Sequence, residues 1–254
     1  MNLNERRLFS VFYGTLSNYN SIDALKVVLE ESKPVSMVFD HRLVLSSWIL
    51  WHKMLGTTPN LITFDAHRDL CEENDLKSII KHIKKTLNES LDLSVFEMLD
   101  SKNDTHINMA CHLGIFNNVF VISNDSSNEL YPINKSNIQV FNTVDSSIID
   151  IMSKEPYILD IDLDYFFDKN ETNNLYQINE LRLQSFLDQK IIFPDKLVGI
   201  TIAIEASYCG GIINAIKVYE KLEHKFFNKP VFIDYYQAEL AVLNEAVTEI
   251  VIQA

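Results

Sequence analysis

One feature limits what this chain can fold into more than any other: short, wholly apolar segments alternate with longer helical stretches along most of its 254 residues. The apolar segments are hydrophobic at successive positions, which is typical of strands buried on both faces of a parallel sheet. The expected strands are Val35–Phe39, Asn60–Phe64, Val119–Ile122, Ile138–Phe141, Tyr157–Ile161 and Leu197–Ile204. The expected helices are Leu43–Leu55, Leu76–Asn88, Ile107–Phe116, Ser146–Ser153, Ile178–Gln189 and Ile212–Lys225.

This order of elements predicts an α/β fold in three layers, with a mainly parallel central sheet between two layers of helices. The chain has six glycines and six prolines and no linker-like segment, so we expect a single domain over residues 1–254. The polar region around 75–105 is expected to form a helical excursion from that domain. The tail Tyr235–Ile252 is expected to form one amphipathic helix.

The charge of the chain indicates which partners it avoids. Asp and Glu number 35 against 22 Lys and Arg, which gives a formal net charge of −13. Such a charge repels the phosphates of nucleic acids and anionic membranes, so we expect neither as a partner. It favours a cationic substrate or a basic peptide, although it also serves solubility alone. The charge does not decide whether the protein forms a homo-oligomer.

The cysteines and the apolar segments indicate the cellular compartment in which the protein works. Cys71, Cys111 and Cys209 are odd in number and widely spaced, which indicates reduced thiols and neither a disulfide framework nor a structural zinc site. The first residues lack the apolar stretch of a signal peptide, and no run has the length of a membrane span. We therefore expect a cytoplasmic protein.

The first candidate site follows the second expected strand. In a parallel sheet, ligands bind beyond the carboxyl ends of the strands. Asp65, His67 and Asp69 occupy alternate positions there, so their side chains point the same way in an extended segment. Two oxygens and an imidazole suit Mn²⁺ and, less selectively, Fe²⁺ or Zn²⁺. A surface turn capped by Asp69 is the alternative.

A second candidate site follows Tyr157-Ile158-Leu159. Asp160, Asp162 and Asp164 would repel one another on one face of a strand unless cations, protons or backbone N–H groups compensate them. A calcium loop fits poorly with the apolar residues between the acids, and the order of motifs does not suit an aspartate-nucleophile phosphatase of the haloacid dehalogenase type. The two sites together offer enough oxygens for a pair of cations.

These motifs resemble those of a known family. Asp65-Ala66-His67-Arg68-Asp69 resembles the DAHxD motif of the arginase/ureohydrolase superfamily, and 160–164 is similar to its second metal motif and to the equivalent strand of the histone deacetylases. Asp40-His41 looks like its first metal motif. Together with Cys209-Gly210-Gly211, the sequence of these motifs resembles that of a divergent group within the superfamily. This group includes the peptide arginases, which convert arginine residues of ribosomally made peptides to ornithine.

The resemblance implies an arginase/deacetylase-like fold that binds two Mn²⁺ or other divalent cations. One cation would be held by His41, Asp65, Asp69 and Asp162, and the other by Asp65, His67, Asp162 and Asp164, so that Asp65 and Asp162 bridge. Asp160 would lie buried beneath these ligands and orient them.

The resemblance also implies hydrolysis of an arginine guanidinium, most simply within a peptide, to ornithine and urea. Asp69 would orient the attacking water, and Glu205 would bind the guanidinium. His106 is the candidate that returns a proton to the leaving amine, with His82 or His112 as replacements. Two alternatives stay open: an amide hydrolase of the deacetylase kind, and a non-catalytic binding protein of the same fold.

Overall fold

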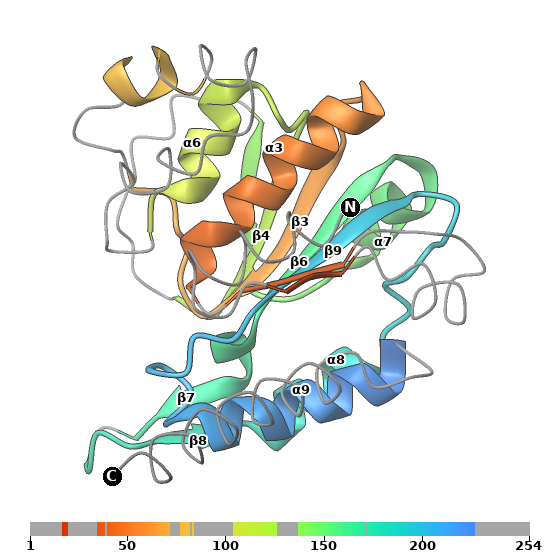
Figure 1. The fold of residues 1–254 in the computed structure, drawn as a ribbon. Helices are drawn as coiled ribbons and strands as arrows, with labels where there is room; N and C mark the ends of the chain where they lie inside the picture. Colours follow the sequence, from red (N-terminus) through yellow and green to blue (C-terminus); the bar gives the residue numbers. More distant parts are fainter. Residues whose placement is uncertain are drawn as a thin grey trace, which may run out of the picture.

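A seven-stranded sheet forms the centre of the computed structural model, which describes residues 17–19, 35–38, 40–71, 77–81, 83, 104–125, 137–170 and 172–226. The strand order is β1-β2-β9-β6-β3-β4-β5 (Figure 1). The strands are β1 (Ser17–Tyr19), β2 (Val35–Val38), β3 (Asn60–Asp65), β4 (Val119–Ser123), β5 (Ile138–Phe141), β6 (Tyr157–Asp162) and β9 (Leu197–Ala203). All neighbours from β2 to β5 are parallel, and β1 pairs antiparallel with β2.

Helices cover both faces of this sheet, which confirms the predicted three-layer α/β fold (Figure 1). On one face, α3 (Val44–Leu55) and α6 (His106–Leu113) pack on a cluster that includes Leu61 of β3 and Val119 of β4. On the other face, α7 (Ser146–Lys154), α8 (Glu180–Asp188) and α9 (Ile212–Phe226) pack on Ile62 and Leu159. Both faces of the central strands are therefore buried, as their continuous apolar character predicted.

The predicted boundaries agree with the observed strands to within one residue at each end. One helix prediction is wrong at its start. Tyr176–Ile178 is strand β8, which pairs antiparallel with β7 (Phe167–Lys169), and α8 begins only at Glu180 because the Asn179 side chain caps it. Of the predicted 75–105 excursion, 77–81 and 83 are helical, and most of the rest lies outside the described residues. The predicted helix Tyr235–Ile252 also lies outside them.

A polar row crosses the α3-facing side of the sheet. Ser36 of β2, Thr201 of β9, Asp160 of β6 and Thr63 of β3 are register partners in turn, so their side chains lie side by side. All four are buried. Buried polar groups are costly unless they are hydrogen-bonded, so the residues of this row need partners. The partners come from the row itself, from α3 and from His41.

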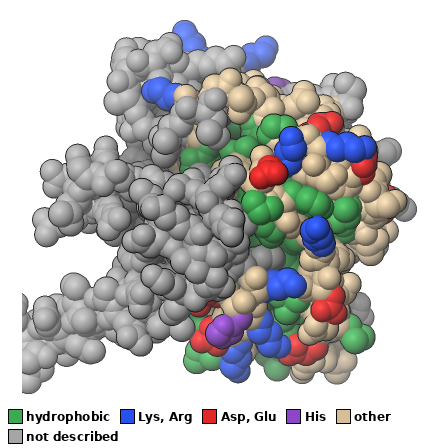
Figure 2. Space-filling model, turned by 90° about the vertical axis from the view of Figure 1, so that its right-hand side faces the viewer, with side chains coloured by type: hydrophobic (Ala, Val, Ile, Leu, Met, Phe, Trp, Pro, Cys, Tyr) green, Lys and Arg blue, Asp and Glu red, His purple; other side chains and the backbone are tan. Residues whose placement is uncertain are grey.

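The exterior seen in Figure 2 carries Lys and Arg interspersed with Asp and Glu, with hydrophobic side chains between them. Charges mixed in this way form no single-sign patch on the part of that face where side-chain types are drawn. Among the described residues, no helix has the length and apolarity needed to cross a membrane.

Candidate metal centre

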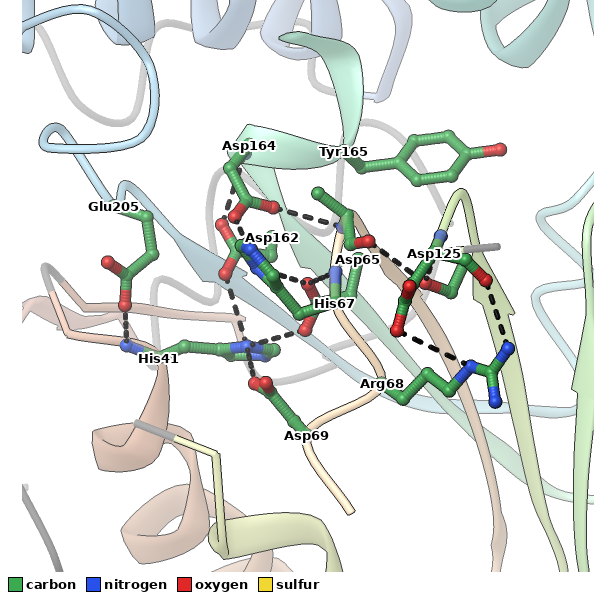
Figure 3. A network of polar contacts seen from close by, with 12 residues as sticks. His41, Asp65, His67, Arg68, Asp69, Asp125, Asp162, Asp164, Tyr165 and Glu205 are labelled. Atoms are coloured by element: carbon green, nitrogen blue, oxygen red, sulfur yellow. Dashed lines mark hydrogen bonds and ion pairs between the residues drawn. The ribbon is translucent and has the colours of Figure 1, made fainter. Parts of the chain in front are cut away.

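The candidate site lies where four parallel strands end. Asp65 and Asp162 are the last residues of β3 and β6, while His41 and Glu205 follow β2 and β9 closely. Figure 3 shows these side chains turned toward one another, together with Asp69 and Asp164. The carboxyl edge of the sheet therefore collects acids and imidazoles that are far apart in the chain, as parallel topology predicts.

His41 is the hub of the cluster and is 1% exposed. Its Nδ1 lies 3.0 Å from Asp69 Oδ2, 3.1 Å from Asp65 Oδ2 and 3.2 Å from Asp162 Oδ2. On the opposite side of the ring, Nε2 lies 2.8 Å from Asp160 Oδ2. Because a carboxylate only accepts, Asp160 fixes a proton on Nε2 and aims Nδ1 at the other three acids.

The polar row beneath α3 in turn holds Asp160. Thr63 Oγ1 donates to Asp160 Oδ2 at 2.8 Å and Thr201 Oγ1 donates to Asp160 Oδ1 at 2.5 Å. Trp48 Nε1 of α3 donates to Thr201 Oγ1 at 3.2 Å. The orientation of His41 therefore depends on the core of the molecule and not on a surface loop.

Three of the acids share one arrangement, in which one oxygen is bound to backbone and the other faces the cluster. Asp65 Oδ1 accepts from the His67 N–H at 2.7 Å. Asp162 Oδ1 accepts from the Asp164 N–H, and Asp164 Oδ1 accepts from the Ala66 N–H, each at 3.1 Å. The backbone bonds leave the second oxygen of each acid pointing at the same small volume.

These second oxygens fit a cation. Asp65 Oδ2 and Asp164 Oδ2 are buried, and each faces an imidazole nitrogen: His41 Nδ1 lies 3.1 Å from the first, and His67 Nδ1 lies 3.1 Å from the second. Buried carboxylates are costly without a positive partner, which either a protonated imidazole or a divalent cation supplies. Carboxylate oxygens with one imidazole nitrogen form a donor set that suits Mn²⁺ and similar cations.

Among the described residues, ligand atoms within 4.8 Å of one another define three groups that could hold a metal ion, one of which is His41, Asp69 and His106. We name the other two by the imidazole that each contains. The His41 group is His41, Asp65 and Asp162, and the His67 group is Asp65, His67 and Asp164. Asp65 belongs to both. His67 Nδ1 lies 3.1 Å from Asp164 Oδ2, and 54% of the His67 side chain is exposed. The His41 group is therefore closed, whereas the His67 group opens to solvent.

Burial controls the protonation of the acids. It raises the pKa of Asp65 to about 7, with the nearby charge of Asp69 adding to the effect. It also raises the pKa of Asp69, Asp162 and Asp164 above the ordinary aspartate value. Carboxyls that ionise reluctantly in the metal-free protein indicate that positive charge is in short supply here.

The imidazoles respond in the opposite way. Burial alone would lower the pKa of His41, but the charges of Asp160 and Asp162 outweigh it and raise that pKa well above the ordinary value. The hydrogen bond to Asp164 raises the pKa of His67 to about 9. Protonated imidazoles thus take the place of cations in the metal-free protein, and metal binding must displace their protons.

Two residues of the site have left-handed backbone conformations. Asp69 has φ 50° and Glu205 has φ 37°, values that are uncommon for residues other than glycine. Glu205 Oε1 accepts from the His41 backbone N–H at 2.7 Å. Burial raises the pKa of Glu205 to about 7. Strained backbone of this kind persists where the surroundings fix a side chain in place, which here aims both carboxylates at the cavity.

His106 lies behind the cluster. It is fully buried, and its ring packs 4.3 Å from that of His41 and 5.6 Å from that of Trp48, between centroids. Its Nδ1 is 3.8 Å from Asp69 Oδ2. The side chain does not line the cavity, so its placement does not support the predicted proton transfer to a substrate. His112 is partly exposed near the end of α6, and the side chain of His82 lies outside the described residues.

A cavity of about 210 Å³ opens over the cluster. The predicted residues that line it are His41, His67, Asp69, Asp162, Asp164 and Glu205. The sequence motifs missed five further lining residues: Arg68, Cys71, Asp104, Asp125 and Tyr208. Arg68 and Asp104 are adjacent to predicted elements. Asp125 and Tyr208 belong to no predicted motif, and only their positions after the ends of β4 and β9 could have indicated that they line the site.

Known proteins resemble this chain only remotely. No family profile matches the chain, and no curated protein matches it. Among solved structures, the crystal structure of a hypothetical agmatinase from Burkholderia thailandensis has 18% identical residues and a TM-score of 0.48. The match covers 75% of this chain and 57% of that one, so this chain spans little more than half the length of its relative. The chemistry of the cavity therefore rests on this chain's own residues.

Proposed function

We propose that this protein is a hydrolase that binds two divalent cations, Mn²⁺ first among them, and cleaves the guanidinium of an arginine side chain in a peptide to give ornithine and urea. One observation carries the proposal. The second oxygens of Asp65, Asp162 and Asp164 converge with two imidazole nitrogens at the mouth of a cavity. A purely structural cluster would have little reason to bury several carboxylates whose ion-pair partners are imidazole nitrogens that could themselves hold a cation.

His41, Asp65, Asp69 and Asp162 would hold one cation, and Asp65, His67, Asp162 and Asp164 the other. Bound divalent cations lower the pKa of water toward neutrality and stabilise negative charge that develops on oxygen.

The chain's own residues supply the remaining chemistry. Asp69 lines the cavity beside His41, so its carboxyl would accept a proton from water and return it to the leaving amine. Glu205 lies across the cavity, where its carboxylate would accept hydrogen bonds from a guanidinium. In this mechanism His106 supports Asp69 and His41 from behind and transfers no proton to the substrate.

The charge of the cavity favours a cationic substrate without a free carboxylate. Six of the eleven lining residues are acidic. The one arginine among them, Arg68, already donates from its guanidinium to the Asp125 carbonyl at 3.0 Å and lies 3.7 Å from the Asp125 carboxylate. Free arginine would bring its α-carboxylate toward this acidic wall, whereas an arginine within a peptide would not.

The test is hydrolysis by manganese-loaded protein of a peptide with blocked termini and one arginine. We expect release of urea and a mass loss of about 42 Da, the change for guanidine-to-amine hydrolysis in metal-assisted catalysis. The control peptide carries lysine in place of arginine, and a second control adds chelator. Free arginine and agmatine, which is arginine without its carboxylate, are compared as substrates.

The outcomes separate the alternatives. Turnover of agmatine and peptide but not of free arginine would support the carboxylate argument. Release of acetate from an acetyl-lysine peptide, without urea from any guanidine, would replace the proposal with an amide hydrolase. Failure to retain Mn²⁺ after loading and desalting would contradict the metal centre itself and leave a non-catalytic protein.

A further inference from the structure

We propose that Tyr208 forms an aromatic wall on which the flat guanidinium of the substrate stacks, and that this contact selects guanidinium over ammonium. The inference rests on the proposed function and deepens it by assigning the residue that determines specificity. Tyr208 lines the cavity beside Glu205 and is 40% exposed, which is high for a tyrosine held in an ordered loop. Among the described lining residues it is the only Phe, Tyr or Trp.

The loop that carries Tyr208 is built to hold it in place. The Tyr208 N–H donates to the Glu205 carbonyl at 2.9 Å, so both side chains belong to one turn. The next residue, Cys209, is buried, and its Sγ donates to the Ile204 carbonyl at 3.4 Å. The Gly211 N–H closes the turn on the Ala206 carbonyl at 2.8 Å. Glu205 and Tyr208 are therefore presented to the cavity as a unit.

Gly210 locks this loop against the β7–β8 hairpin. It has φ 69°, and a Cβ at this position would lie 3.1 Å from the Tyr176 carbonyl oxygen. A glycine allows both the left-handed conformation and this close approach. The hairpin thus supports the loop from behind and keeps Tyr208 over the cavity, which explains the Cys209-Gly210-Gly211 motif in physical terms.

The surroundings of the Tyr208 ring suit a planar cation. The His67 ring lies 5.2 Å away in an edge-on arrangement, and the Tyr176 ring lies 6.2 Å away on the hairpin. Tyr176 already has Lys169 Nζ 5.8 Å from its centroid. A cation drawn in by Glu205, Asp69 and Asp164 would therefore meet an aromatic face with acids around it, which strengthens cation–π attraction.

Carboxylates alone do not distinguish the ammonium of lysine from the guanidinium of arginine. An ammonium and a guanidinium carry the same charge, so an acidic wall attracts both. A guanidinium is flat and weakly hydrated, and it stacks on aromatic faces, whereas an ammonium is compact and strongly hydrated. A single aromatic wall in an acidic cavity is thus the feature that can tell the two apart.

The experiment measures binding of butylguanidinium and butylammonium, which share charge and stem, to manganese-loaded protein by isothermal titration calorimetry. Urea is assayed in the cell afterwards, so that hydrolysis is read separately from binding. The variants are Tyr208→Phe, which keeps the ring, Tyr208→Leu, which removes it, and Phe193→Leu as a matched control at an aromatic residue that lies near Lys190 and does not line the cavity. Manganese stoichiometry and thermal melting verify that each variant keeps its metal centre and fold.

We expect Tyr208→Leu to weaken butylguanidinium binding about 5- to 30-fold, the range of a partly desolvated cation–π contact, and to leave butylammonium within about 2-fold. Tyr208→Phe and Phe193→Leu should bind both probes nearly as wild type does. Equal losses for both probes, or no loss in Tyr208→Leu, would overturn the aromatic wall even if urea is released. Preferential guanidinium binding without urea would instead uphold the wall and reject the hydrolysis.

Discussion

The His41 group and the His67 group use the same kinds of ligand but differ in what stands behind them. His41 is buried and held on both ring nitrogens, with Asp160 and the polar row beneath α3 as support. His67 is half exposed, and its ring contacts are Asp164 and Tyr208. One candidate cation site is thus built into the core, whereas the other faces the cavity. A metal pair can combine a fixed anchor with a position that adapts to substrate.

The largest effect should come from Asp65, because it belongs to both groups. We expect Asp65→Asn to lower manganese stoichiometry toward zero and to reduce urea release by about 1000-fold or more, as for loss of a bridging ligand. Inductively coupled plasma mass spectrometry and the urea assay measure the two effects. Asp150→Asn, which alters an exposed ion pair with Lys154, is the matched control. Retention of two Mn²⁺ would show that the groups do not share this acid.

The two imidazoles should give unequal results. We expect His41→Asn to abolish manganese binding at the His41 group and to lower the melting temperature, because the substitution breaks a buried hydrogen-bond network. His67→Asn should weaken only the second site, about 10- to 100-fold, and should leave the melting temperature of the metal-free protein within a few degrees, because the side chain is half exposed. Calorimetric titration with Mn²⁺ and thermal melting provide both readouts. Equal effects of the two substitutions would remove the distinction between the groups.

Protons should oppose metal binding in a predictable direction. The folded pKa values of Asp65 and Glu205, both about 7, lie above those of the unfolded chain, so the native state binds more protons. Their stabilising contribution is therefore present at low pH and is lost as pH rises from about 4 to about 7. The raised pKa of His67, about 9, acts in the same direction at higher pH.

Urea unfolding of chelator-treated protein at pH 5 and pH 8 measures this dependence. The metal-free protein should be less stable at pH 8, and saturating Mn²⁺ should reverse the order because the cation replaces the displaced protons. A metal-free protein that gains stability between pH 5 and pH 8 would contradict the assignment of the cluster as a cation site.

The smallest change should come from Asp160→Asn. The asparagine keeps an acceptor for His41 Nε2 but removes the charge that raises its basicity. We expect manganese affinity at the His41 group to fall about 10-fold, the lower end for an outer hydrogen-bond partner, with the His67 group unchanged. Thr201→Val, which removes one donor to Asp160, should act in the same direction and less strongly. Equal weakening of both groups would mean that Asp160 supports the whole edge of the sheet.

Much of the fold was readable from the sequence because the central strands are buried on both faces. Ile158 and Leu159 point to opposite helical layers, so the strand is apolar at successive positions until Asp160, and its start is sharp. The β7–β8 hairpin was missed because its strands are three residues long and mostly exposed, which leaves no burial pattern. Its Tyr176–Ile178 strand reads equally well as the first turn of a helix.

The site was predictable to the extent that short spacing in the chain implies closeness in space. Asp65, His67 and Asp69 follow one strand, and the structure gathers them. Tyr208 and Asp125 were missed because their role depends on the folding of a turn and on the order of the strands, neither of which their neighbours in sequence encode. The role of His106 stays a prediction for the same reason, since a helix position does not tell which side of an imidazole cluster the ring will occupy.

The strand order also has a consequence for how the protein is made. Strand β2, which leads into His41, joins the sheet only through β9, the last strand described in the chain. A nascent chain that has emerged as far as Asp164 holds most of the acids but lacks the strand that joins β2 to the rest of the sheet. The complete candidate metal site can form only after β9 has left the ribosome, so we expect a chain truncated before Leu197 to bind the cations poorly.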